Sequence, residues 1–74
     1  MNRIFKDLLN LLLERYNFTI SSGFVSEISA RRTLVFGMKN AVELAYNCED
    51  IGSAKVLQDH LRMLREQDVI PKPV

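Results

Sequence analysis

Residues 29–47, SARRTLVFGMKNAVELAYN, decide whether this chain contains a strand or folds with helices alone. As a strand, the segment offers only the short apolar run TLVF, which would end at Gly37. As a helix it accounts for more positions, because small side chains recur every four residues beside a parallel row of large ones. The small row is Ser29, Thr33, Gly37, Ala41 and Ala45, and the large row is Leu34, Met38, Val42 and Tyr46.

Gly37 needs a reason to be inside a helix, because glycine costs roughly 1 kcal/mol there relative to alanine. The row of small residues supplies that reason, since it lets a second helix approach closely while the large row fills the flank of the contact. We therefore predict one long helix that begins between Ser22 and Ser26 and ends at Asn47. A break near Gly37 is the alternative.

An earlier helix is predicted over residues 3–16, with Asn2 as its N-cap. Its polar positions form one narrow stripe, so its apolar face is wider than a surface helix of a small domain usually shows. Because a chain of 74 residues has little else to cover this helix, we expect a second copy or a larger protein to cover it. The apolar rows are Ile4, Leu8, Leu12 and Tyr16, and beside them Phe5, Leu9 and Leu13.

Residues 17–25, NFTISSGFV, are predicted to form a connector whose apolar side chains fill the core. Phe18 and Ile20 alternate with polar residues, which leaves a short extended piece as the alternative. The sequence does not decide between an extended and a helical conformation for this segment.

A third helix is predicted over residues 51–67, with Asp50 or Ser53 as its cap. Two prolines follow and make residues 70–74 an extended tail. The predicted fold class is therefore all-α, with an N-terminal amphipathic helix followed by a long antiparallel helical hairpin. We expect one small domain over residues 1–74, and we expect it to be dimeric.

The chain has one cysteine, Cys48, and one histidine, His60. A single cysteine cannot close an internal disulfide, and this pair cannot assemble a structural zinc site. Cys48 is expected near the end of a helix, where the helix dipole disfavours a thiolate, and no nucleophile or carboxylate is placed to work with His60 as a base. We therefore expect a protein that is not an enzyme, has no metal or cofactor, and resides in a reducing cytoplasm.

The formal net charge is +1, from ten Lys and Arg against nine Asp and Glu. Proteins that bind mainly through phosphate contacts carry a marked excess of positive charge. No apolar stretch approaches the roughly 20 residues of a membrane span. Nucleic acid is therefore a possible but not a favoured partner, and no membrane partner is expected.

Residues 53–70, SAKVLQDHLRMLREQDVI, are similar to the recognition helix of winged helix-turn-helix regulators, in which a polar start leads to HL-x-x-L and an acidic-to-apolar exit. AVELA at residues 41–45 resembles the preceding helix of that motif. Asp59 and Glu66 lower the positive charge of the same helix. A DNA-binding transcriptional regulator is therefore our alternative hypothesis and not the main one. The resemblance implies groove-facing side chains at Ser53, Lys55, Gln58 and Arg62.

Our main hypothesis is a small protein–protein interaction or regulatory module, of the adaptor or inhibitor type that mobile elements commonly encode. It would bind a larger protein, a second copy or both through apolar helix faces. The sequence identifies neither the partner nor a host or phage origin, and it does not distinguish an activator from an inhibitor. The candidate anchors are apolar residues in excess of what the hairpin can cover, namely Phe5, Leu9, Leu13, Phe18 and Phe24.

Overall fold

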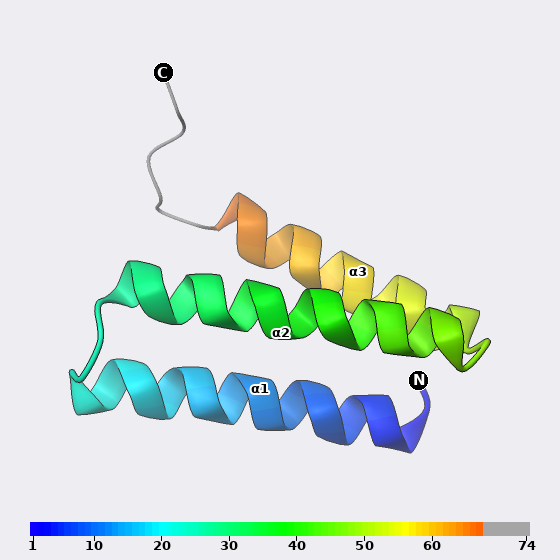
Figure 1. Cartoon of the computed structure of the whole chain (residues 1–74), viewed down its shortest axis with the longest axis horizontal. Coiled ribbons are helices and arrows are strands. Elements are labelled where there is room, and N and C mark those ends of the chain that lie inside the picture. Colours follow the sequence, from blue (N-terminus) through cyan, green and yellow to red (C-terminus); the bar gives the residue numbers. More distant parts are fainter. Residues whose placement is uncertain (68–74) are drawn as a thin grey trace.

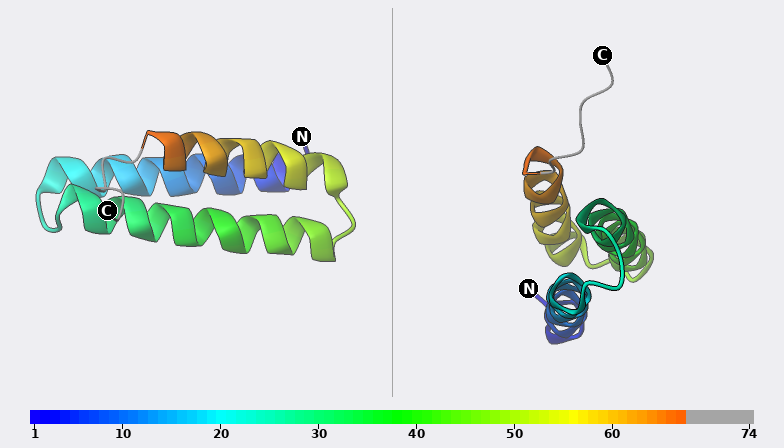
Figure 2. Two further views of the ribbon diagram at one scale, coloured as in Figure 1. Left: turned by 90° about the horizontal axis from the view of Figure 1, so that it is seen from above. Right: turned by 90° about the vertical axis from the view of Figure 1, so that its left-hand side faces the viewer.

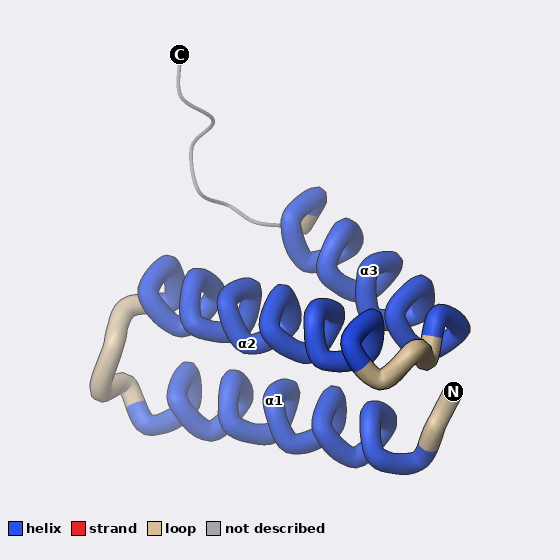
Figure 3. Tube along the Cα trace, turned by 45° about the vertical axis from the view of Figure 1, so that its right-hand side comes forward, coloured by secondary structure: helices blue, strands red, loops and turns tan. Residues whose placement is uncertain are grey.

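The computed structural model describes residues 1–67 and shows three helices in this part of the chain (Figure 1). They are α1 (Arg3–Ser22), α2 (Glu27–Asn47) and α3 (Ile51–Glu66). No strand forms among the described residues (Figure 3), so the all-α prediction is confirmed. The tail predicted over residues 70–74 lies outside them.

Helix α2 packs against both of the other helices and runs antiparallel to each of them (Figures 1 and 2). Helices α1 and α3 run in the same direction and contact each other much less. The predicted order, an N-terminal helix followed by a helical hairpin, is therefore confirmed. Dimerisation stays a prediction.

Each helix begins at a side chain that accepts a hydrogen bond from an otherwise unpaired backbone N–H group. The Asn2 side chain accepts from the Ile4 N–H at 2.9 Å and starts α1. Ser26 is the N-cap of α2, and the Asp50 carboxylate accepts from the Ser53 N–H at 3.1 Å to start α3. The cap expected at Asn2 is therefore confirmed, α2 begins at the Ser26 end of its predicted range, and Asp50, not Ser53, is the cap of α3.

Helix α1 is longer than the sequence predicted, because residues 17–22 continue it instead of forming a connector. Hydroxyl groups near its end donate back to carbonyls of the preceding turn, as Thr19 Oγ1 does to the Arg15 oxygen at 2.8 Å. The helix ends where Gly23 adopts the left-handed conformation, with φ of 70°. A side chain is strained in that conformation, so glycine is well suited to this C-terminal position.

Helix α2 runs without a break through Gly37, so the strand and the broken helix are both excluded. Leu12 of α1 lies directly over this glycine. A Cβ atom added to Gly37 would be 2.8 Å from Leu12 Cδ2, well inside van der Waals contact. The close helix approach predicted from the small row is confirmed at this position.

The core lies where α2 faces its two neighbours. Met38 of α2 and Leu57 of α3 have no exposed surface, and Phe5 and Leu9 are the residues of α1 that are fully buried. Six residues of the 21 in α2 are buried, against two of the 20 in α1. Helix α2 is therefore the central element, and α1 shows the larger exposed surface.

Polar contacts join the helices at both ends of the bundle. At one end the Asn2 N–H donates to Ser53 Oγ at 3.0 Å, which links α1 to α3. At the other end the Arg31 guanidinium donates to Tyr16 Oη at 3.3 Å and to the Gln67 carbonyl at 2.6 Å. No buried side-chain nitrogen or oxygen of the described residues lacks a partner.

Candidate interaction surface

The five residues proposed as interface anchors do not form one surface. Phe5 and Leu9 are only 3% and 6% exposed, and Leu13 is half-buried against the same core. Phe18 and Phe24 remain 68% and 84% exposed. The prediction that Phe5 and Leu9 exceed what the chain can cover was wrong, because the chain's own core buries them.

A row of exposed apolar side chains follows the outer face of α1. Ile4, Leu11 and Phe18 are 68%, 61% and 68% exposed, and they are seven residues apart. Seven residues are close to two helical turns, so the three side chains lie on one line along the helix. We call these three residues the α1 stripe. The seven-residue spacing is readable in the sequence, but the sequence did not show that this line faces away from α2.

A second group of exposed apolar residues surrounds the connector between α1 and α2. Ile20 belongs to the end of α1, Phe24 and Val25 to the connector, and Ile28 to the first turn of α2, and all four are exposed. Their exposure has a simple cause, because α3 ends before it reaches this part of the hairpin (Figures 1 and 3). We call these four residues the hairpin tip.

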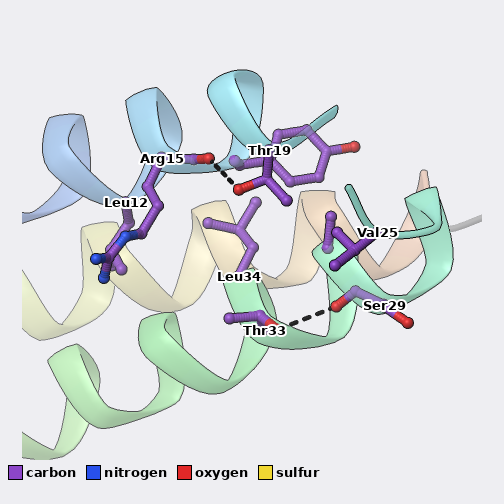
Figure 4. Close-up of a pocket in the computed structure, with 9 residues that line it drawn as sticks. Leu12, Arg15, Thr19, Val25, Ser29, Thr33 and Leu34 are labelled. Atoms are coloured by element: carbon purple, nitrogen blue, oxygen red, sulfur yellow. Dashed lines mark hydrogen bonds between the residues drawn. The ribbon is translucent and has the colours of Figure 1, made fainter. Parts of the chain in front are cut away.

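A groove of about 290 Å³ separates α1 from α2 next to the connector (Figure 4). The threonines that line it donate their hydroxyl protons within their own helices, Thr19 to the Arg15 carbonyl and Thr33 to the Ser29 carbonyl. The rest of the lining is mainly apolar. The two threonine hydroxyls are therefore engaged within the fold, and the Arg15 guanidinium is the charged group among the lining residues.

One further aromatic residue, Phe36, is 66% exposed in the middle of α2. It borders a second, shallower groove between α2 and α3, together with Lys39, Glu43 and Gln58. Charged and amide groups therefore surround Phe36, and it belongs neither to the α1 stripe nor to the hairpin tip.

The residues proposed for DNA contact are only partly on one face. Lys55, Gln58 and Arg62 are exposed on α3, at spacings that place them on the same side of the helix. Ser53 is 1% exposed and accepts the hydrogen bond from Asn2, so it faces the core. Arg62 also lies 3.9 Å from the Asp59 carboxylate. The expectation that Ser53 faces a DNA groove is therefore corrected.

The polar groups of the described residues serve the fold. Hydrogen bonds from the Ser53 side chain and then its backbone N–H hold the pKa of the Asp50 carboxyl below its usual value.

Cys48 is exposed and His60 is half-buried. Within residues 1–67, no three His, Cys, Asp or Glu side chains gather as metal ligands would. Each helix of this part of the chain is too short or too polar to span a lipid bilayer.

Comparison of the chain with protein-family models, with curated proteins and with solved structures gives no match in any of the three.

Proposed function

We propose that this chain is a small non-enzymatic protein-binding module, of the adaptor or inhibitor type, that acts in the cytoplasm by covering a surface of a larger protein. The α1 stripe is the surface that makes this contact. A second copy of the chain is the other partner that such a surface can accept. No metal, cofactor or covalent step is part of this mode of action.

The exposure of the α1 stripe is the observation that carries the proposal. Large aliphatic and aromatic side chains are mostly buried in folded proteins, and three of them exposed along one line of a helix favour an interaction site. Ile4, Leu11 and Phe18 extend along about 21 Å of helix at a rise of 1.5 Å per residue. Apolar anchors at such spacing are typical of a helix that packs against a partner helix or in a groove.

A DNA-binding regulator that uses α3 is the second candidate. The shared exposed face of Lys55, Gln58 and Arg62 favours it. The burial of Ser53 and the Arg62–Asp59 contact weaken it, because they remove one proposed contact and place an acidic group beside another. We therefore place the protein-binding module first.

The test is affinity capture of the tagged chain from a lysate of its own host, with and without nuclease. We expect a stoichiometric protein partner that resists nuclease and that the variant Leu11→Asp no longer captures. Leu11 is exposed, so this change should leave the helical circular dichroism of the chain intact.

Asn10→Asp is the matched control, because it adds the same charge at the neighbouring exposed position of the polar face. The proposal predicts that this control still captures the partner. Loss of binding in both variants would show a general charge effect and would contradict a contact through the α1 stripe. Capture of DNA that nuclease removes, with no protein partner, would favour the regulator instead.

A further inference from the structure

The hairpin tip differs from the α1 stripe in shape. Its four side chains come from α1, the connector and α2, so they surround the end of the hairpin instead of following one helix. A partner helix that lies along α1 or α2 contacts only one side of such an end. A medium into which the end is inserted can contact all four side chains together.

The connector makes this end blunt and apolar. Helix α1 stops at Gly23, α2 starts at its cap Ser26, and the two residues between them are Phe24 and Val25. Phe24 is the most exposed large apolar residue of the described chain, at 84%. Among the described residues, the carboxylate of Glu27 is close to this end, and it lies 2.7 Å from the Arg31 guanidinium, which neutralises it.

The stretch of sequence that forms this end of the hairpin carries a net positive charge. Residues 15–36 contain three arginines and one glutamate. The rest of the described chain contains six basic and seven acidic residues. Arg15 and Arg32 are exposed, and at 1.5 Å per residue they lie about 9–12 Å along their helices from the connector.

This arrangement matches the cross-section of a membrane interface. Apolar side chains of a peripheral protein enter the boundary between headgroups and acyl chains to about 5–10 Å, and basic side chains just outside contact anionic headgroups. Aromatic residues such as phenylalanine add the largest gain per side chain. This end of the hairpin has apolar side chains at the tip and basic side chains further from it, in the same order.

We propose that the hairpin tip inserts into the surface of an anionic lipid bilayer, with Arg15 and Arg32 at the level of the lipid phosphates. This goes beyond the protein-binding role of the α1 stripe and does not depend on it. It also revises the expectation from the sequence, which considered only a membrane-spanning segment. A chain that lies on a bilayer by its tip needs no such segment.

The test is co-sedimentation of the purified chain with vesicles. One set is phosphatidylcholine alone, and the other contains about one third phosphatidylserine, as an anionic membrane surface does. We expect binding to the anionic vesicles, weaker binding to the neutral ones, and loss of the anionic preference at high salt. Phe24→Ser should lower binding to the anionic vesicles by about tenfold or more, because the most exposed apolar side chain no longer enters the bilayer.

Phe36→Ser is the matched control, because it removes an exposed phenylalanine from the middle of α2 and leaves the tip unchanged. It should bind vesicles as the unmodified chain does. Both positions are exposed, so circular dichroism should show the same helical content in all three proteins. Absence of binding to both vesicle types would overturn the proposal. An equal loss of vesicle binding in the Phe24→Ser and Phe36→Ser variants would also overturn it.

Discussion

Arg31 shows how much of the structure one polar side chain can hold. Its guanidinium donates to Tyr16 of α1, to Glu27 of its own helix and to the Gln67 carbonyl at the end of α3. The planar group with five N–H donors suits such a contact, which a lysine could not reproduce. The sequence shows the i,i+4 spacing to Glu27 but not the neighbours from α1 and α3, so it does not predict this role.

Asp50 leads to a prediction about pH. Its folded-state pKa lies below the usual value of 3.8, so its contribution to stability is complete above that pH and is lost as the pH falls below it. Asn caps a helix as well as Asp but does not titrate. We therefore expect the free energy of unfolding of Asp50→Asn to be close to that of the unmodified chain at pH 7 and to fall less steeply below pH 3.8.

The measurement is urea unfolding followed by circular dichroism at several pH values. Asp50→Ala serves as the control for the loss of the cap itself, and should cost about 1 kcal/mol at pH 7. Identical acid dependence in the Asp50→Asn variant and the unmodified chain would contradict the role given to this carboxylate.

At the scale of the elements, α1 and α2 are in tight contact where Leu12 lies against Gly37. A side chain at this position would meet Leu12, so a large residue must push α1 away or force Leu12 into another rotamer. We expect Gly37→Leu to lower the free energy of unfolding by about 1–3 kcal/mol, even though leucine is the better helix former.

Gly52→Leu is the matched control in α3, because its added Cβ meets nothing closer than 3.9 Å. The same substitution there should leave stability unchanged or raise it by up to about 1 kcal/mol. Thermal or urea unfolding of the two variants gives the comparison. Equal effects at both positions would show that α1 does not approach α2 at Gly37.

The helices themselves could be predicted from the sequence because their apolar spacing and caps agree. The predicted third helix was one residue longer than α3, and the predicted second helix ended at Asn47, as α2 does. The end of α1 was missed because Phe18 and Ile20 alternate with polar residues as a strand would. In the structure both side chains are exposed on a helix, so their alternation with polar residues does not reflect one buried face of a strand.

The interface residues were harder to predict, and for a physical reason. Most of the circumference of α1 is apolar, and side chains from both of its apolar rows pack against the core, so periodicity does not say which apolar residues stay outside. The structure turns Phe5 and Leu9 to the core and leaves Ile4 and Leu11 outside. In this orientation Leu12 packs against Gly37, which is a contact between segments 25 residues apart in the chain.

At the scale of the whole molecule, one helix is covered on two sides and its neighbours on one. Helix α2 uses its full core-facing surface within the chain, while α1 and α3 scarcely contact each other. A domain of this size gains only about 3–5 kcal/mol from its core. The exposed apolar residues lie outside that core. They are available to partners, along α1 for a protein and at the hairpin tip for a lipid surface.

The most direct test of this account is carbene footprinting with mass spectrometry on the purified chain, at a dilution where sedimentation shows monomers. We expect strong labelling of Leu11 and Phe18 and weak labelling of Phe5 and Leu9, because the first pair is exposed and the second is in the core. Weak labelling of Leu11 and Phe18 in the monomer would contradict it, because the α1 stripe would then be buried by the chain itself.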